Sequence, residues 1–477
     1  MNSLAPTPRP SQLQAPASEL SGPQPSASGG LLILAQAWAA LGGGDTLGAG
    51  LRWRGKASQL LLWVLVALPL LPLHSLRAVA GWCAADADPL RAALGWAAAV
   101  SQRRLDRFVL SPRHDWLAVL EAMARAMARH PATAVGENGV LAVDSTTIEK
   151  RYGPHMAERS PVYDAVPGKL VDGYAVVSAC AVEGERHWSV GLWPYRKALT
   201  AAERAQHARR RRPARAGERP SKLDLALMLV GVAVRAGVAA GTVVADSAFA
   251  VSWWLREIAA LGRHWLVSLR KDRRLRIGAE VQSVEDWAKT APLQRWTSEP
   301  HGQELWGGQL PEGVLLDKGC QRKGLPCRAT IMERRSRAGK VLHRWYLATS
   351  QLAWDLGAVW QHWEWRWPVE ELHRTGKQQL GMEDFHVRRW EGLVAWLVCS
   401  SLRASLVAFV RAADPVCGAL STEGLAAALS GAACLVEQQV DGGAMVSLPP
   451  TLRAVTLWNQ APAPLPARWW PLRLKAA

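Results

Sequence analysis

The sequence predicts a mixed α/β sheet that follows a helical domain and is interrupted by a β-rich insertion. Two short apolar runs, Gly139–Thr147 and Gly241–Phe249, each lead into an aspartate, as buried strands that carry a carboxylate do. Two further strand-like runs, Val171–Val182 and His187–Pro194, follow the first run. Three adjacent strands of this kind predict an antiparallel meander.

Helical patterns alternate with the later strands. Ser221 predicts the start of a helix, with Asp224 as its capping-box partner and Gly237 as its stop. Val251–Ala260 predicts a short helix, and His264–Leu269 predicts the next strand. The resulting order of three strands, helix, strand, helix and strand is that of a mixed α/β sheet.

A helical domain is predicted ahead of the sheet. Ala- and Leu-rich segments separated by Gly and Pro predict helices over Leu31–Leu41, Ala57–Leu68, Leu76–Ala84, Pro89–Val100 and Trp116–Arg129. This basic unit either holds a helix-turn-helix for DNA or is a scaffold that reads no bases. Residues 1–30 are rich in Pro, Ser and Gly and predict a disordered tail.

The pattern changes again after the second aspartate. Polar, Gly-bearing sequence over residues 277–340 predicts a β-rich insertion, Val341–Ser350 predicts a returning strand, and Leu393–Ala412 predicts an apolar helix that packs across the sheet. The predicted domains are a tail (1–30), a helical domain (31–135), two parts of the sheet (136–276 and 341–412), the insertion (277–340) and a C-terminal region (413–477).

The charge of the chain indicates its partner. Over 477 residues, 57 Lys and Arg stand against 40 Asp and Glu, a formal net charge of +17. An excess of this size favours a polyanion, usually nucleic acid and less often an anionic membrane. The apolar stretch Leu60–Leu73 is shorter than the ~20 residues of a spanning helix. Pro69 and Pro72 interrupt it, so it predicts a buried helix that ends near Pro69 and no membrane partner.

The cysteines indicate a reducing compartment. The seven cysteines are scattered, form no C-x-x-C pair and have no zinc-finger spacing. The N-terminus has no charged start followed by an apolar run, so no signal peptide is expected. We therefore expect a cytoplasmic, nucleoid-associated protein.

One stretch combines a carboxylate with basic residues. Trp363, Arg366, Glu370 and Lys377 fall at offsets 0, 3, 7 and 14, which share roughly one face of a single helix. Pro368 allows two arrangements: a helix kinked at that residue, or a new helix that begins there with Glu370 in its first turn. Glu371 is a rival for Glu370, but it lies ~100° further around a helix.

These residues suit metal-dependent chemistry on phosphodiesters. Asp144 and Asp246 at strand ends and Glu370 on a helix come from three separate elements and could converge. Mg²⁺ prefers oxygen ligands and retains waters, so a few carboxylates suffice to hold it. Two such ions ~4 Å apart can activate a water and stabilise a leaving oxygen. The sequence lacks H-E-x-x-H, G-x-S-x-G, P-loop and complete dinucleotide-binding motifs.

The three motifs resemble those of a known family. LAVDSTTIEKRYGP around Asp144, VVADSAFAVSWWLREI around Asp246, and the Trp363–Lys377 stretch are similar to those of bacterial insertion-sequence transposases with an RNase H-like core and a DDE triad. The best-matching group carries Tyr, Arg, Glu and Lys at the offsets seen here, with Trp363 in place of Tyr. The group also has a β-rich insertion between the second Asp and the Glu.

The resemblance implies roles for single residues. Asp144, Asp246 and Glu370 would be catalytic and would bind Mg²⁺ or Mn²⁺, as two ions. Arg366 and Lys377 would contact DNA phosphates, with Trp363 close by. An aromatic residue of the insertion, Trp296 or Trp306, would stack on an extruded base, or it would serve core packing. Separately, the arginine run Arg209, Arg210, Arg211 and Arg212 either grips phosphates or belongs to a solvated loop.

The predicted function is that of a DNA transposase. The enzyme would cleave at the ends of its element and transfer the strands into target DNA, acting on terminal inverted repeats as a homodimer on DNA. The alternative is a catalytically inactive or domesticated relative that only binds DNA.

Overall fold

The computed structural model describes most of the chain between residues 100 and 421 and shorter stretches outside it. The described residues are 24–26, 30–43, 47, 51, 56–70, 73, 75–84, 100–151, 155–164, 167–197, 202, 205, 212–216, 218–298, 303–317, 323–421, 424–425, 428–429, 434–438, 444–447 and 472–474.

Twelve of the described strands form one mixed sheet, in the order β3-β4-β2-β6-β7-β13-β12-β11-β8-β9, with β5 also paired to β4 and β10 to β11. The strands of its first half are β2 (Val140–Glu149), β3 (Ser160–Asp164), β4 (Lys169–Glu183), β5 (Arg186–Tyr195), β6 (Thr242–Ala245) and β7 (His264–Ser268). Those of its second half are β8 (Arg274–Ile277), β9 (Glu280–Ser283), β10 (Gln294–Ser298), β11 (Gln303–Leu316), β12 (Gly324–Arg335) and β13 (Val341–Thr349).

The first half has the RNase H-like arrangement. β5, β4 and β2 are antiparallel neighbours, and β2, β6 and β7 are parallel neighbours. The predicted meander and the two strands that lead into the aspartates are therefore confirmed. Asp246 follows the end of β6 as predicted, but β2 continues to Glu149, so the prediction of Asp144 at a strand end is wrong. The short strand β3 was not predicted.

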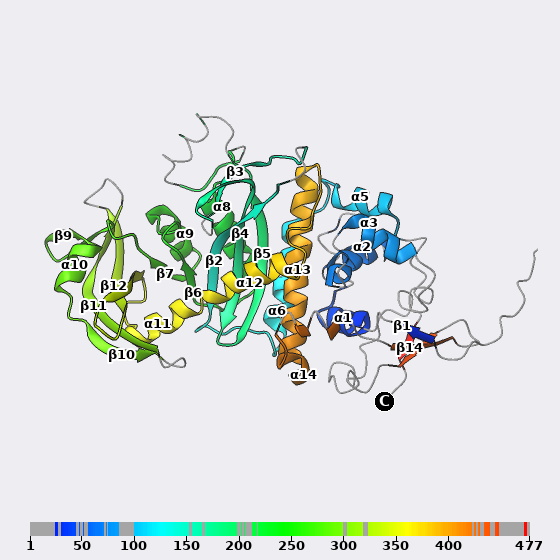
Figure 1. Ribbon diagram of the computed structural model, residues 1–477. Coiled ribbons are helices and arrows are strands. Elements are labelled where there is room, and N and C mark those ends of the chain that lie inside the picture. Colours follow the sequence, from blue (N-terminus) through cyan, green and yellow to red (C-terminus); the bar gives the residue numbers. More distant parts are fainter. Residues whose placement is uncertain are drawn as a thin grey trace, which may run out of the picture.

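The second half of the sheet is built from the segment between the two parts of the core. β13 pairs with β7, and β12 pairs with β13, both antiparallel. β11, β8 and β9 extend the same sheet further, so the strands between Asp246 and Glu370 continue the core sheet (Figure 1).

Helices cover both faces of the sheet. One face packs against α8 (Lys222–Arg235) and α9 (Ser252–Ala260), and the other against α11 (Leu356–Glu364) and α12 (Trp367–Gln378). The capping box between Ser221 and Asp224 is present, and Gly237 has a φ of +81° just after α8, so both predicted boundaries are confirmed. The helix α10 (Val284–Thr290) lies among the strands of the second half.

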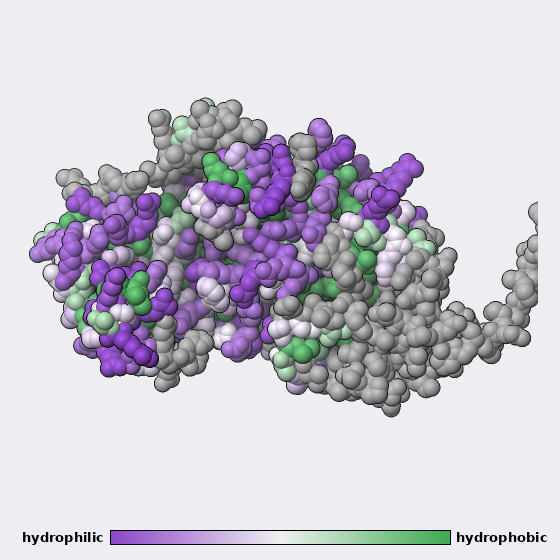
Figure 2. Space-filling model, in the orientation of Figure 1, coloured by the Kyte–Doolittle hydropathy of each residue, from purple (hydrophilic) through white to green (hydrophobic). Residues whose placement is uncertain are grey.

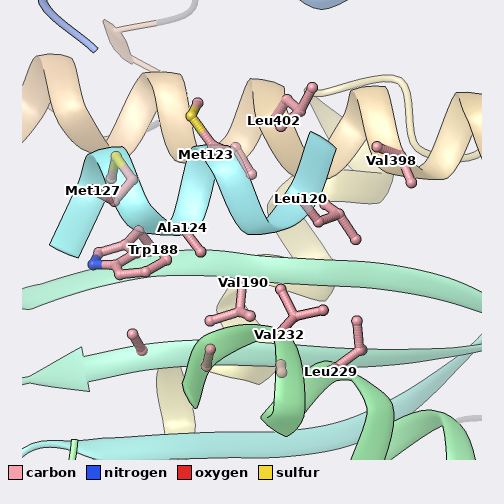
Figure 3. Close-up of a cluster of buried hydrophobic side chains, with 14 of the residues drawn as sticks. Leu120, Met123, Ala124, Met127, Trp188, Val190, Leu229, Val232, Val398 and Leu402 are labelled. Carbon is pink, nitrogen blue, oxygen red and sulfur yellow. The ribbon is translucent and has the colours of Figure 1, made fainter. Parts of the chain in front are cut away.

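The long helix α13 (Trp390–Ala413) joins the sheet to the N-terminal helices. It packs on β5, as predicted, and also contacts α1 (Gly30–Ala40), α2 (Lys56–Ala67), α5 (Gln102–Val109) and α6 (Trp116–Arg129). Figure 1 shows it as a pillar between the sheet and the N-terminal helices. Figure 3 shows the core at this junction, where Leu120, Met123 and Met127 of α6 lie between α13 and β5.

Most of the N-terminal helices were predicted. The structure has α1, α2, α3 (Leu76–Ala84) and α6 near the expected positions, and it adds α5. The predicted helix Pro89–Val100 lies, apart from its last residue, outside the described residues, as does most of the predicted tail. Within that tail, β1 (Gln24–Ser26) belongs to a second sheet with β14 (Cys434–Gln438), β15 (Ala444–Ser447) and β16 (Leu472–Leu474).

The apolar helices belong to the core. α2 ends at Ala67, and a short 3₁₀ turn η2 (Leu68–Leu70) follows, so the prediction of a buried helix ending near Pro69 is confirmed. Among the described residues, α13 is the one helix long and apolar enough to cross a membrane by length and composition, and 94% of its most apolar stretch is buried inside the fold. The short helix α14 (Pro415–Gly418) follows it.

Candidate active site

The register of the sheet places the two predicted aspartates side by side. β2 and β6 are parallel, and their last paired residues are Val143 and Ala245. Asp144 and Asp246 come next on the two strands, so each carboxylate leaves the sheet at the same level. This arrangement follows from the two apolar runs, because both bury fully up to the residue before the aspartate.

Strand alternation decides which face Asp144 uses. Leu141 and Val143 point toward the α8 side, whereas Val140 and Ala142 pack with α11 and α12. Asp144 shares the second face, where α12 lies over β2 and β4. A carboxylate on α12 can therefore approach Asp144.

The Trp363–Lys377 stretch is divided between two helices. α11 ends at Glu364, and α12 begins at Trp367 with a proline in its first turn. The alternative of a new helix is confirmed, although that helix begins at Trp367, one residue before Pro368, and the single straight helix is wrong. Glu370 lies in the first turn of α12, where the positive end of the helix dipole favours a carboxylate, and Trp363 lies on α11.

Arg366 connects the first and third carboxylates. Its Nη1 donates to Asp144 Oδ2 at 3.2 Å, its Nη2 donates to Glu370 Oε1, and its guanidinium lies 5.0 Å from the ring centre of Trp363. The side chains of Arg366 and Asp144 are each 16% exposed. Arg366 Nε is buried and has no hydrogen-bond partner among the described residues. The guanidinium is thus held by the carboxylates and is incompletely satisfied.

The electrostatics of the site are those of crowded carboxylates. Burial and, next, the charge of Asp246 raise the pKa of Asp144 to about 6, while Arg366 and the Ser145 backbone N–H oppose the shift. Lys222, the first residue of α8, donates to Ser145 Oγ at 3.2 Å. Burial lowers the pKa of Lys222, and Asp246 and Asp144 partly offset this. Arg366 and Lys222 therefore supply positive charge to the pair of aspartates.

A buried polar contact fixes α12 on the sheet. Ser178 on β4 faces Asp144 in the antiparallel register, and its Oγ lies 2.6 Å from His373 Nε2 on α12. The same hydroxyl lies 3.3 Å from the carbonyl oxygen of Asp144. Burial lowers the pKa of His373 to about 3, so the imidazole is neutral at physiological pH. His373 is one helical turn after Glu370, so this contact sets the height of Glu370 above Asp144.

The residues suit a hard divalent cation in their chemistry. All three side chains offer carboxylate oxygens, which Mg²⁺ and Mn²⁺ prefer. Burial first and the charge of Asp246 second raise the pKa of Asp144, so a cation bound beside it would favour its ionised form. Across the part of the chain that the structure describes, no three acidic, His or Cys side chains converge closely enough to hold one ion. Arg366 stands between Asp144 and Glu370, so binding would require this guanidinium to withdraw.

The structure ties the other predicted DNA-contacting residues to the protein itself. Lys377 donates to the carbonyl oxygen of Thr147 at 2.6 Å, and its Nζ lies 3.6 Å from Glu383 Oε1. Arg212 forms a two-pronged ion pair with Glu218, with N–O distances of 2.8 and 2.9 Å. Arg209, Arg210 and Arg211 lie outside the described residues.

The aromatic candidates of the insertion pack against neighbours. The ring of Trp296 meets that of Trp360 edge-on at 6.5 Å, and Trp306 lies under the guanidinium of Arg335 at 4.4 Å. A different aromatic group lines a cavity of about 700 Å³ beside Arg366, at the junction of α11 and α12. It consists of Trp345, Trp360, Trp363, Trp365 and Trp367.

Three features of this site were not found in the sequence. The Lys222–Ser145 and Ser178–His373 contacts join residues that lie far apart in the chain, and the tryptophan cavity depends on how β13, α11 and α12 pack together. The one local signal was that Lys222 directly follows a predicted helix start at Ser221.

The fold and the site define the class of protein. A mixed sheet of RNase H-like topology that presents two adjacent aspartates, with a glutamate on a covering helix, is the arrangement of a nuclease-type enzyme.

The comparisons with protein families agree with that class. A family described as DDE superfamily endonuclease matches residues 88–296, which include Asp144 and Asp246. A second, described as transposase DDE domain, matches residues 228–402, which include Asp246 and Glu370. Together the two matches support a DDE-superfamily transposase or endonuclease. No curated protein matches the chain.

Proposed function

We propose that this protein is the transposase of a bacterial insertion sequence, of the group with the Tyr-Arg-Glu-Lys last motif. It would cleave DNA at the ends of its element and join them to target DNA in the cytoplasm. The observation that carries the proposal is the parallel register that sets Asp144 beside Asp246 under Glu370. The net charge of +17 suits a DNA substrate.

The carboxylates would hold two Mg²⁺ or Mn²⁺ ions. When bound, such ions lower the pKa of a water and stabilise charge on the leaving oxygen of a phosphodiester. The rigid strands β2 and β6 fix the positions of Asp144 and Asp246, and the Ser178–His373 contact fixes α12, which carries Glu370. The chain would thereby present its carboxylates with little reorganisation.

Basic residues around the carboxylates would bind the substrate. Arg366, once released from Asp144 and Glu370, would reach a phosphate of the bound DNA end. Lys377, about two helical turns after Glu370 on α12, would contact a second phosphate. The exposed Trp367, with 57% of its surface accessible, and the neighbouring tryptophan cavity offer a stacking surface for an unpaired base. We expect a homodimer on DNA that pairs the two ends of the element.

The first prediction tests the three carboxylates. Asp144→Ala, Asp246→Ala and Glu370→Gln should each lower Mg²⁺-dependent nicking of element-end DNA on the order of 10³-fold or more, because each removes a charged oxygen donor. Binding of the same DNA should stay largely intact. The end sequences can be taken from the DNA that flanks the gene, as inverted repeats bounded by short direct duplications.

The exposed Asp272 provides the control. Its side chain is 76% accessible and lies outside the site, so Asp272→Ala should nick like the wild type. Undiminished nicking by any of the three site variants would overturn the triad. Loss of nicking in Glu371→Gln with an active Glu370→Gln would move the role to Glu371. A wild type that binds the ends but nicks with neither Mg²⁺ nor Mn²⁺ would favour the DNA-binding relative.

A further inference from the structure

We propose that a groove lined by four arginines on the N-terminal helices binds the phosphate backbone of duplex DNA, at a distance from the carboxylates. The inference rests on the proposed function and adds a second contact to it. The groove, called the arginine groove below, has a volume of about 650 Å³. It is lined by Arg103, Asp106, Arg107, Leu110, Ser111, Pro112, Arg113 and Arg389.

The four arginines come from three elements that meet there. Arg103 and Arg107 lie one helical turn apart on α5, and Arg113 lies in the turn that leads to α6. Arg389 is the residue that caps the start of α13. All four side chains are exposed. Asp106 is the one acidic residue among those that line the groove, so the net charge of the lining is strongly positive.

These arginines differ from several others near the surface whose charge is paired within the protein. Arg125, Arg212 and Arg256 form ion pairs with Glu121, Glu218 and Asp317. Among the described residues, none of the four groove arginines forms an ion pair. Their charge is therefore available to a partner, and four guanidinium groups in one groove complement the charge of a nucleic-acid backbone.

The groove is held rigid by the core beneath it. Leu105 and Phe108 form the buried side of α5, and the His114 ring lies 4.6 Å from that of Phe108. The turn also packs closely against α13, because a Cβ atom at Gly392 would lie 3.0 Å from Leu110 Cδ2. Arginines on a fixed base lose less freedom on binding than arginines on a mobile loop, which favours a specific backbone contact.

The position of the groove fits a duplex that runs on from the active site. Asp144 and Lys150 are six residues apart along β2 and its end, roughly 20 Å in an extended strand. Lys150 Nζ donates to the carbonyl oxygen of Phe385 at 2.9 Å, four residues before Arg389. The groove thus lies near the end of β2 that follows Asp144, on the order of 20 Å from that residue along the strand, which corresponds to about 6 base pairs of DNA.

The views of the molecule agree with this path. Figure 1 shows α5 beside the upper end of α13, while α12 crosses the centre of the sheet. Figure 2 shows hydrophilic residues over both regions. A DNA end with its terminus at the carboxylates would lay its inner part against the arginine groove.

The second prediction tests this surface by salt dependence. Binding of Arg103→Ala, Arg107→Ala and the double variant to a labelled duplex of about 30 base pairs that carries the element end should be measured by fluorescence anisotropy over a KCl series. Each lost phosphate contact should lower the slope of log affinity against log salt by about 0.9, and the double variant by about 1.8. A duplex of about 5 base pairs from the cleaved terminus should bind wild type and variants alike.

Arg129→Ala is the matched control. Arg129 is an exposed arginine in the last turn of α6, near the far end of α13, where the neighbouring His130 ring lies 4.7 Å from Phe409. It is therefore roughly 30 Å from the groove along α13. This variant should keep the wild-type slope. Thermal melts should show that all variants fold like the wild type, since the substituted side chains are exposed.

The outcomes separate this proposal from the proposed function. A double variant with the wild-type slope and affinity would overturn the arginine groove even if the wild type nicks DNA. A reduced slope in a protein that never nicks would keep the groove and remove the catalytic proposal. A loss of binding to anionic vesicles but not to the duplex would also overturn the groove, because the partner would then be a membrane surface.

Discussion

The buried Arg403 and the half-buried Arg366 are held in opposite ways. Arg403 on α13 is fully buried, and all three of its donor nitrogens bond backbone carbonyls: Nε that of Val66 at 3.1 Å, Nη2 that of Leu65 at 2.9 Å, and Nη1 that of Leu380. Arg366 bonds two carboxylates instead, and its Nε is left without a partner among the described residues.

The partners of each arginine indicate its role. Arg403 bonds backbone carbonyls near the end of α2 and after α12, so it joins those segments to α13. The carboxylates that hold Arg366 are those proposed to bind metal. A contact whose partners are needed elsewhere, and which leaves a buried donor unsatisfied, is suited to exchange. The comparison therefore separates a charge used for stability from one that we propose is used for function.

The largest effect on stability is expected at Arg403. Burial lowers its pKa to about 10, so it remains charged at neutral pH. Arg403→Met would remove the donors to three carbonyls and should cost about 3–5 kcal/mol, a large share of the free energy of unfolding of a typical protein. Urea unfolding measures the loss, and Arg129→Met is the control on an exposed arginine. A variant as stable as the wild type would show that water replaces the guanidinium.

Substitution of Asp144 should stabilise the protein, whereas substitution of Arg403 should destabilise it. The folded pKa of Asp144, about 6, lies above the ordinary value of 3.8, so its ionisation weakens the fold as pH rises through 6. Without divalent metal, Asp144→Asn should therefore be more stable than the wild type at pH 7.5, by up to about 3 kcal/mol. The difference should shrink as pH falls from 7 toward 4.

Thermal unfolding across that pH range measures this difference. Asp272→Asn, at an exposed carboxylate, should show no such gain. Equal stability of Asp144→Asn and wild type at every pH would mean that water or Arg366 fully compensates the buried charge.

The sequence predicted the elements of this site better than their contacts. The strands of Asp144 and Asp246 were identified because apolar runs of strand length lead into each carboxylate, and the helix of Ser221 because its cap is local. β3 was missed because its five residues include a proline. α5 was missed because it is only eight residues long, although Leu105, Phe108 and Val109 have the i, i+3, i+4 spacing of a helix.

The contacts were not predictable because they depend on long-range pairing. Arg366 was assigned to phosphate, yet the structure places it on Asp144, 222 residues away. The choice at Pro368 was left open in the sequence, since a kink and a new helix satisfy the same local rules. The Ser178–His373 contact requires both the register of β4 on β2 and the docking of α12.

The smallest expected effect is the change in Mg²⁺ affinity and stability when Arg366 is replaced. If this guanidinium competes with metal for Asp144 and Glu370, Arg366→Gln should bind Mg²⁺ about tenfold more tightly, a gain of about 1.4 kcal/mol. Without metal, the variant should be less stable than the wild type by about 1–2 kcal/mol, because the carboxylates then repel one another. The melting temperature without metal measures the stability, and its rise over a Mg²⁺ series measures the affinity for Mg²⁺. Arg129→Gln should respond as the wild type does. Nicking should nevertheless fall, since a phosphate contact is lost. An Mg²⁺ response equal to that of the wild type would mean that Arg366, like Arg403, is held for the fold alone.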